Sequence, residues 1–490
     1  MLSYQKSENI HLHWRRTKII ATLGPTSKSE AKVAQLIDAG VNVFRLNMSH
    51  GTHDEHREMA MRIRKISERK KQHVAILMDL CGPKIRVGTF ENEAIEIVAG
   101  EEVIVSCTAV TGKPGLIPSQ YKNLYKDVKR GDRILLDDGK LELIVKSIKD
   151  KDVKCKVVYG GVLKNKKGLN LPDSKISTTS FTAKDKRDAM LAIELDADFL
   201  ALSFVRDEKC LKTLKRFVLG AGGNIPVIAK IEKPEAIKWI DNILLEADGI
   251  MVARGDLGIE MPAQQVPLIQ KDLINKARLH GKPVIVATQM LESMITSSKA
   301  TRAEVGDVAT AALSSADAVM LSAETASGEY PILAVNMMND ILREMEAYQY
   351  HHGKFGETEF DEYSDDIVLD RKAVAKAVKS LADELKLQGI LVPTRSGSTA
   401  RVLSADRPGA PLIGISSNKS VCRRLALNWG VVPLHIEKEV TNDWRGLCDK
   451  VCDMCKISKA GNRVLLVSGF SDDPEANEPV MKLMNTKKEA

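Results

Sequence analysis

The amino-acid sequence predicts an α/β fold class: a (β/α)8 TIM barrel with an inserted all-β lid domain after strand 3 and a C-terminal α/β domain. Eight apolar, β-branched runs alternate with helical patterns over about the first 350 residues, their spacing breaks once, and a second α/β pattern follows. Apolar strands that alternate with helices are typical of a parallel sheet covered on both faces. Eight such units are the number that a (β/α)8 barrel requires. A doubly wound open sheet is the structural alternative, and the count disfavours it.

The eight predicted barrel strands are short, and polar or glycine residues follow each of them. They are Lys18–Gly24, Val43–Met48, Val74–Asp79, Phe199–Phe204, Pro226–Glu232, Gly249–Asp256, Pro283–Gln289 and Ala318–Glu324. About 120 residues separate the third strand from the fourth, which is far more than one crossover needs. Much of this gap alternates in the manner of strands, with turn signals such as Asp-Asp-Gly. The pattern indicates an inserted β domain that could act as a lid over the barrel mouth.

These patterns divide the chain into five predicted regions. A polar, acidic connector, HHGKFGETEFDEYSDD, follows the barrel, and the strand-like runs GILVPT, PLIGIS, VVPLHI and RVLLVSG come after it. We expect an N-terminal extension over 1–14, a catalytic barrel over 15–83 and 182–350, the lid over 84–181, a linker over 351–365 and a regulatory α/β domain over 366–490.

Composition and charge exclude several classes of protein. Lys and Arg outnumber Asp and Glu by 72 to 65, a mild excess that is weak evidence for nucleic-acid binding. Aromatic residues make up 4% of the chain, so stacking surfaces for single-stranded nucleic acid are scarce. No run approaches the roughly 20 apolar residues of a membrane span, and the first residues lack the apolar core of a signal peptide. We therefore expect a cytoplasmic protein with neither nucleic acid nor membrane as a partner.

Polar residues gather at the carboxyl ends of the predicted strands, where a (β/α)8 barrel builds its active site. Each of them alone could be an ordinary polar residue that ends a strand, but together they indicate one site at the barrel mouth. They are Arg45, Asn47 and Ser49 on strand two, Asp79 on strand three, Lys230 and Glu232 on strand five, Arg254, Gly255 and Asp256 on strand six, Thr288 on strand seven, and Ser322 and Glu324 on strand eight.

The residue types at this mouth suit an anionic substrate and a divalent metal. Glu232 and Asp256 are paired carboxylates on adjacent strands, which suits a Mg²⁺ ion that keeps waters and substrate oxygens. Lys230 and Arg45 supply positive charge to an anion and to its migrating charge. Gly255 lets the backbone approach a ligand closely. The set predicts stabilisation of an enolate or of a phosphoryl transition state, and no Ser-His-Asp or Cys-His arrangement competes with it.

At these residues the sequence resembles the pyruvate kinase family, and the resemblance covers nearly the whole chain. The motifs that carry it are RTKIIATLGP, NVFRLNMSHG, MDLCGPKIRVG, LLDDG, KGLNLP, AKIEKPEAI, GIMVARGDLG, ATQMLESMI, TRAEVGDVA and DAVMLSAETASGEYP. It implies transfer of a phosphoryl group from phosphoenolpyruvate to ADP, giving pyruvate and ATP through an enolate. It also implies a Mg²⁺ cofactor, with Mn²⁺ as an alternative ion, and a homotetramer.

The resemblance further implies a role for each matching residue. Glu232 and Asp256 would hold Mg²⁺, Lys230 and Arg45 would contact the phosphoryl group, and Arg86 would assist from the lid hinge. Ala253, Arg254, Gly255 and Asp256 would frame the substrate, with Thr288 beside its methylene carbon and Ser322 helping Thr288 to relay a proton through water. Asn47, His50 and Arg86 would line the nucleotide side, and Lys167 in the lid is a further candidate, although a solvated surface lysine is an equal alternative there.

One departure from the family pattern concerns a monovalent cation. Many family members use K⁺ beside Mg²⁺, with ligands that match Asn47, Ser49, Asp79 and the carbonyl of Leu80, and with a glutamate in a Gly-Pro-Glu segment. Here that segment is Gly-Pro-Lys, ending at Lys84. Our hypothesis is that the Lys84 ammonium supplies the charge of K⁺ from within the chain, so that K⁺ is not required. A solvated hinge lysine is the alternative.

A second candidate site lies in the C-terminal region. Thr394, Arg395, Ser396, Gly397, Ser398 and Thr399 follow a predicted strand and precede a predicted helix. Hydroxyls and free N–H groups at such a place form a phosphate pocket, and the resemblance makes it the loop that binds a phosphorylated allosteric effector. An ordinary helix cap is the alternative. The later loop GFSDDPEANEP is acidic, which favours an activating monophosphate, such as a sugar monophosphate or AMP, over fructose 1,6-bisphosphate.

Two other functions compete with this interpretation. A Mg²⁺-dependent aldolase or lyase on the same barrel would also need a pyruvate enolate beside a carboxylate-bound metal, but it needs neither the β insertion nor the α/β tail. A phosphometabolite sensor without catalysis is the other alternative, and the intact set of Lys230, Glu232, Asp256 and Thr288 argues against it.

Overall fold

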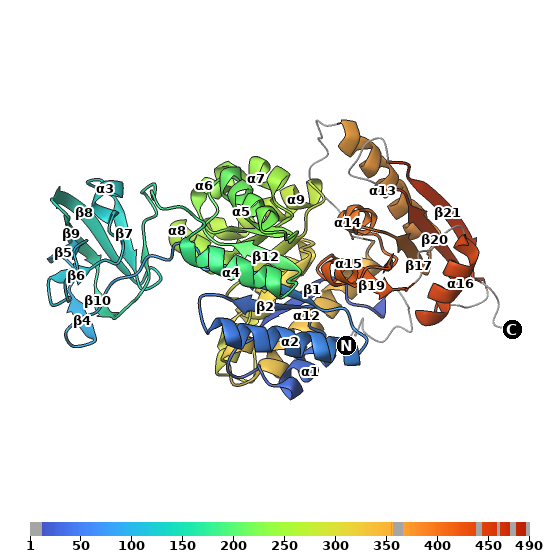
Figure 1. The fold of residues 1–490 in the computed structure, drawn as a ribbon, viewed down its shortest axis with the longest axis horizontal. Helices are drawn as coiled ribbons and strands as arrows, with labels where there is room; N and C mark the ends of the chain where they lie inside the picture. Colours follow the sequence, from blue (N-terminus) through green and yellow to red (C-terminus); the bar gives the residue numbers. More distant parts are fainter. Residues whose placement is uncertain are drawn as a thin grey trace.

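The computed structural model describes residues 12–353, 355, 366–437, 443–457, 461–470 and 477–486. Most of the predicted N-terminal extension and linker, and residues 471–476 of the acidic loop, lie outside the described residues. Three bodies lie in a row, with the lid at one end, the barrel in the middle and the C-terminal domain at the other end (Figure 1). Within the described part of the chain, no helix is both long and apolar enough to cross a membrane.

The central body is a closed barrel of eight parallel strands, in the order β1-β16-β15-β14-β13-β12-β3-β2. The predicted (β/α)8 fold is thus confirmed, and each strand begins within one residue of its predicted start. The strands are β1 (Lys18–Thr22), β2 (Val43–Asn47), β3 (Ala75–Asp79), β12 (Phe199–Leu202), β13 (Val227–Ile231), β14 (Gly249–Ala253), β15 (Val284–Ala287) and β16 (Ala318–Leu321).

Helices surround the barrel because successive side chains of each strand point to opposite faces. Along β1, Ile20 packs in the barrel interior, whereas Ile19 and Ala21 join the larger core under the helices. Thr52, Thr182 and Thr301 each start a helix with a reciprocal capping box. The helices are α1 (Glu30–Asp38), α2 (His53–Arg69), α4 (Ala183–Glu194), α5 (Glu208–Gly220), α6 (Pro234–Lys238), α7 (Ile240–Glu246), α8 (Arg254–Glu260), α9 (Val266–Leu279), α10 (Arg302–Leu313), α11 (Ala323–Ala326) and α12 (Pro331–His351).

The lid is all-β apart from the short helix α3 (Leu124–Asp127), and it has its own apolar core. A six-stranded sheet, in the order β11-β7-β8-β9-β5-β6, lies beside the pair β10-β4. The alternating runs EAIEIVAGEEVIVS, RGDRILLDDGKLELIVKSI and VKCKVVYGGVL predict these strands, except for β6 and β11, which are only three and two residues long. The strands are β4 (Ala94–Ile97), β5 (Glu102–Ser106), β6 (Leu116–Pro118), β7 (Arg133–Leu136), β8 (Leu141–Lys149), β9 (Asp152–Tyr159), β10 (Gly161–Lys164) and β11 (Leu169–Asn170).

The C-terminal domain contains a five-stranded sheet in the order β19-β18-β17-β20-β21. Four of its strands were predicted, and the fifth, β21, pairs antiparallel with β20 at the sheet edge. The strands are β17 (Gly389–Pro393), β18 (Leu412–Ser416), β19 (Val431–His435), β20 (Arg463–Ser468) and β21 (Val480–Asn485). The helices are α13 (Asp366–Glu384), α14 (Ser398–Ala405), α15 (Lys419–Leu425) and α16 (Trp444–Met454).

Candidate active site

A largely buried lysine, Lys230, lies at the barrel mouth with its side chain 12% exposed. Lys230, near the end of β13, has its Nζ 2.9 Å from Glu232 Oε1 and 3.3 Å from Asp79 Oδ1. Burial opposes the charge on this ammonium, but the Asp79 and Glu232 carboxylates outweigh burial and raise the pKa of Lys230 above its ordinary value. Lys230 is therefore a permanent, preoriented cation at the mouth.

Beside this lysine, the Glu232 carboxylate is almost fully buried. Its Oε2 accepts a hydrogen bond from the Phe204 backbone N–H at 2.8 Å. Burial raises the pKa of Glu232, Lys230 opposes that shift, and the nearby charge of Asp256 adds to it. Asp256 lies in the first turn of α8 and lines a cavity between lid and barrel together with Lys84, Asn170, Phe204 and Lys233.

The Glu232 and Asp256 carboxylates repel each other, and a divalent cation would remove this repulsion. Among the described residues, no three or more His, Cys, Asp and Glu side chains form a metal-binding group. Oxygen ligands, few in number, are the set that Mg²⁺ accepts in enzyme sites, because this ion keeps several waters and binds substrate oxygens. Glu232 and Asp256 thus fit Mg²⁺ better than a metal that needs a complete protein shell.

A second cation, Arg45, is tied to the same centre through Asp79. Arg45 Nε and Nη2 both lie 2.7 Å from Asp79 Oδ2, and Arg45 Nη1 donates to Thr22 Oγ1 at 3.1 Å. Asp79 is fully buried, and burial alone would raise its pKa. The positive charges of Lys230 and Arg45 lower that pKa instead. Asp79 therefore stays ionised and orients both cations.

The ends of β14 and β15 form a compact backbone cradle. The Gly255 N–H donates to Thr288 Oγ1 at 2.7 Å, and the Thr288 hydroxyl donates to the Ala287 carbonyl at 2.6 Å. A Cβ at Gly255 would lie 3.2 Å from Thr288 Oγ1, so any larger residue would push against the cradle. Thr288 has a φ of 68°, a strained conformation that is concentrated at functional sites.

Arg254 and Ser322 flank this cradle. Arg254 Nη2 donates to the carbonyls of Thr288 and Gln289 at 3.1 and 2.6 Å, so its guanidinium braces the turn after β15. Ala253, at the N-terminal end of α8, is buried. Ser322 follows β16, and its N–H donates to Glu324 Oε2 at 2.7 Å.

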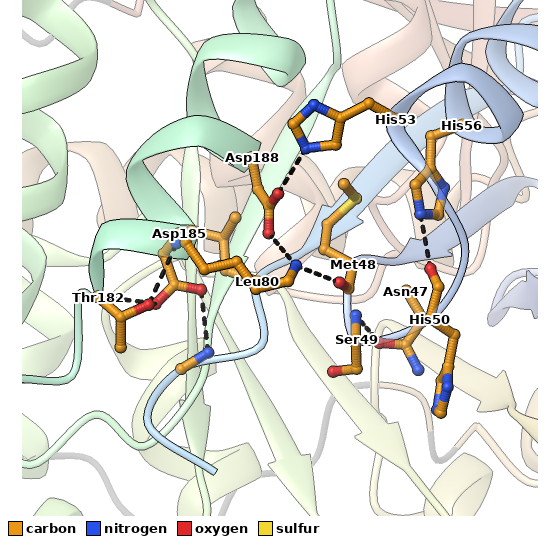
Figure 2. Close-up of polar contacts among 12 residues, drawn as sticks. Asn47, Met48, Ser49, His50, His53, His56, Leu80, Thr182, Asp185 and Asp188 are labelled. Atoms are coloured by element: carbon orange, nitrogen blue, oxygen red, sulfur yellow. Dashed lines mark hydrogen bonds and ion pairs between the residues drawn. The ribbon is translucent and has the colours of Figure 1, made fainter.

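The loop after β2 carries the residues expected on the nucleotide side (Figure 2). Asn47 Oδ1 accepts a hydrogen bond from the Ser49 N–H at 3.1 Å, and the His50 carbonyl lies 2.9 Å from His56 Nε2. The His50 side chain points away from this network in Figure 2. Burial and the positive charges of Lys84, Arg86 and Arg45 lower the pKa of His50, so these four side chains share one electrostatic environment.

Lys84 follows the segment that carries Asp79 and Leu80, two of the four residues expected to bind a monovalent cation. Its side chain is exposed, and no ion pair links it to a carboxylate of the described residues. Asp79 instead contacts Arg45 and Lys230, and the Leu80 carbonyl accepts a hydrogen bond from Ser203 Oγ at 2.7 Å.

The two candidate cations of the lid have local partners. Arg86 Nη1 donates to the Lys166 carbonyl at 2.9 Å, which fixes the guanidinium near the hinge. Lys167 Nζ lies 2.8 Å from Asp137 Oδ1, and this hydrogen bond raises the pKa of Lys167.

The loop expected to bind an effector is tightly turned. Gly397 has a φ of 88°, and its N–H donates to Thr394 Oγ1 at 2.9 Å. Helix α14 begins directly afterwards with Ser398 and Thr399, both buried, whereas Arg395 and Ser396 are exposed. Two of the hydroxyls thus cap the loop's own N–H groups.

The sequence argument missed two features of this mouth. Ser203 Oγ bridges Lys230 Nζ, at 2.8 Å, and the Leu80 carbonyl. Ser203 directly follows β12, so the strand-end rule that found Lys230 would also have found it. The second feature is a buried ion pair: Lys233 Nζ lies 2.5 Å from Glu260 Oε1, which also accepts a hydrogen bond from Asn170 of the lid at 2.9 Å.

Fold and site together define a (β/α)8-barrel enzyme with a lysine–carboxylate centre under a β lid. Known proteins agree with that class. Residues 14–335 match the family model "Pyruvate kinase, barrel domain", and residues 372–482 match "Pyruvate kinase, alpha/beta domain".

Individual relatives agree as well. A pyruvate kinase of Geobacillus stearothermophilus is 42% identical over 96% of this chain and 80% of its own length. Pyruvate kinase 2 of Synechocystis is 44% identical over 86% of this chain and 70% of its own length. The crystal structure of a pyruvate kinase from Cryptosporidium parvum superposes with a TM-score of 0.88 at 32% identity, covering 97% of both chains. The chain belongs to the pyruvate kinase family, and the predicted phosphotransferase class is confirmed.

Proposed function

We propose that this chain transfers the phosphoryl group of phosphoenolpyruvate to ADP at the mouth of the barrel. The observation that carries the proposal is the Lys230 ammonium, held between Asp79 and Glu232. Asp256, whose charge acts on Lys230 and Glu232, lines the cavity between lid and barrel. Glu232 and Asp256 would hold Mg²⁺, or Mn²⁺ in its place, and this ion would supply positive charge to the substrate oxygens.

Lys230 and Arg45 would receive the charge of the transferring phosphoryl group, with Arg86 assisting from the hinge. This stabilisation is strongest where preoriented charges face the developing charge. The backbone of Ala253, Arg254 and Gly255 would bind the substrate carboxylate. The enolate left after transfer needs a proton on carbon, and Thr288 would relay it through water together with Ser322. Asn47, His50 and Lys167 would bind the nucleotide.

A coupled assay tests this proposal directly. Purified protein, phosphoenolpyruvate and ADP should yield pyruvate and ATP in equal amounts, and omission of Mg²⁺ or of ADP should abolish both products. Cleavage of a carbon–carbon bond in a keto acid, with no ATP formed from phosphoenolpyruvate and ADP, would favour the aldolase or lyase alternative. Binding without turnover would favour the sensor.

We further propose that K⁺ is not required, because Lys84 stands where K⁺-dependent members have a glutamate. Lys84 lines the same cavity as Asp256, and its charge already acts on His50. A flexible four-carbon stem lets an ammonium move within such a cavity.

Turnover by the wild type in tetramethylammonium buffer should therefore change less than about twofold when K⁺ is added. The Lys84→Glu variant should lose at least about tenfold without K⁺ and recover with it, because the carboxylate recreates a cation site; this factor corresponds to about 1.4 kcal/mol. Lys146→Glu, the same charge reversal at an exposed lid position, should behave like the wild type. A wild type that depends on K⁺ would contradict this proposal.

We also propose allosteric activation by a phosphorylated metabolite at residues 394–399. The support is a tight turn at a helix start with exposed Arg395 and Ser396. We expect a sugar monophosphate or AMP to lower the concentration of phosphoenolpyruvate at half-maximal rate. A titration in which only fructose 1,6-bisphosphate activates would reverse the choice of effector. The homotetramer and the cytoplasmic location stay predictions.

A further inference from the structure

Helix α4 is the first element of the barrel after the chain returns from the lid. Its first turn is hydrogen-bonded to both of the segments that connect the barrel to the lid. The Asp185 side chain is fully buried. Its Oδ2 accepts hydrogen bonds from Thr182 N and Thr182 Oγ1 at 2.8 and 2.6 Å, and its Oδ1 accepts one from Gly82 N at 3.0 Å. Gly82 lies where the chain leaves the barrel, and Thr182 lies where it returns.

Lys184, in the same turn of α4 as Asp185, and Asp188, one turn further on, hold the loop after β2. Figure 2 shows Asp188 beside His53. Lys184 Nζ donates to the Met48 carbonyl at 2.5 Å and to Asp188 Oδ2 at 2.6 Å. Asp188 Oδ1 lies 2.8 Å from His53 Nε2, in the first turn of α2. Lys184 and Asp188 thus fix both ends of this loop, through Met48 at its start and His53 at its end.

The Met48 carbonyl, which accepts the hydrogen bond from Lys184, is next to residues of the candidate site. Met48 lies between Asn47 and Ser49, and its position in the backbone decides where both side chains point. Asp188 is only 1% exposed, so its carboxylate depends on protein groups rather than on water for its hydrogen bonds. Charge-assisted hydrogen bonds of this length are among the stronger ones in proteins, which makes Lys184 more than a surface lysine although its side chain is 46% exposed.

We propose that Lys184, with Asp188 and His53, is a positioning residue for the nucleotide: it fixes the loop that presents Asn47 and His50. The inference rests on the proposed nucleotide role of these two residues. Lys184 is part of neither the Lys230–Asp79–Glu232 centre nor the Gly255–Thr288 cradle. Its loss should therefore weaken the binding of ADP and leave the binding of phosphoenolpyruvate unchanged. Because Asp185 holds the hinge from the same helix turn, α4 joins the nucleotide loop and the lid hinge in one rigid element.

The test compares full-length wild type with Lys184→Met by calorimetric titration of ADP and by steady-state kinetics. Loss of a charged hydrogen-bond donor corresponds to about a tenfold weaker interaction or more, so the Kd and KM for ADP should rise about tenfold. The KM for phosphoenolpyruvate should stay within about twofold. Lys184→Arg, which keeps a cationic donor, should restore most of the ADP affinity. Lys186→Met, an exposed position two residues further on the same helix, is the matched control and should change neither value.

Equal ADP affinity in wild type and Lys184→Met, or an equal loss for both substrates, would overturn the inference. If Lys184→Met does not fold, His53→Phe removes the other partner of Asp188 and leaves Lys184 in place. This variant should raise the Kd for ADP about threefold, while an unchanged Kd would overturn the inference as well. The calorimetric readout needs no turnover, so a failure of the proposed reaction is distinguishable from a failure of this positioning role.

Discussion

Replacing Lys230 by Met should lower kcat by about 10²–10³-fold or more, because a single preoriented charge at the site of developing charge is worth that much. Lys230 is held between two carboxylates rather than exposed for capturing substrate, so the interaction should be made mainly in the transition state. The KM for phosphoenolpyruvate should therefore rise far less than kcat falls. Steady-state kinetics with saturating Mg²⁺ and ADP measure both constants.

Lys212→Met on α5 is the control for this substitution, because that lysine is exposed on the barrel surface and should leave both constants unchanged. A Lys230→Met enzyme that keeps its kcat and loses only KM would assign Lys230 to ground-state binding and contradict the account. Circular dichroism of the variant is needed beside the kinetics, since Lys230 also balances the charge of Asp79.

Replacing Arg407 by Met should lower the free energy of unfolding by about 3–5 kcal/mol, the cost of leaving one partner of a buried ion pair unpaired. Arg407 follows α14 and is 1% exposed. Its Nη1 and Nη2 donate to Asp317 Oδ1 and Oδ2 at 3.2 and 2.8 Å. Because Asp317 directly precedes β16, this pair joins the C-terminal domain to the barrel, and the first transition in urea should move to lower concentration.

Arg57→Met is the matched control, because Arg57 makes a comparable pair with Glu194 at an exposed place. Exposed pairs contribute about 1 kcal/mol or less, so this variant should unfold close to the wild type. An Arg407→Met protein within about 1 kcal/mol of the wild type would show that packing around Trp429, and not the ion pair, holds the two domains together.

The barrel was predictable because its physical cause is local. Continuous apolar runs such as Val284–Ala287 and Gly249–Ala253 have to be buried on both faces, and only strands inside a shell of helices allow it. Strand β21 was not predictable in the same way. It pairs at a sheet edge, and Val480, Met481 and Leu483 are exposed, so its pattern shows neither continuous burial nor a clear alternation.

For the site, the sequence predicted where the residues lie but not which of them contact each other. The rule that polar residues at strand ends meet at one mouth placed Lys230, Glu232 and Asp79 together, because the barrel closes. It could not decide which charges pair. Asp79 contacts Arg45 and Lys230 and Lys167 contacts Asp137, and these choices depend on distances of a few ångströms between segments far apart in the sequence.

The central claim is that Glu232, beside Lys230, helps to hold one divalent ion. Titration with Mn²⁺, followed by the electron paramagnetic resonance of the free ion, tests it most directly. We expect one site per chain in the wild type and in Glu235→Gln, a control three residues further along the chain, and an affinity at least about tenfold lower in Glu232→Gln. An unchanged Mn²⁺ affinity in Glu232→Gln would contradict the account.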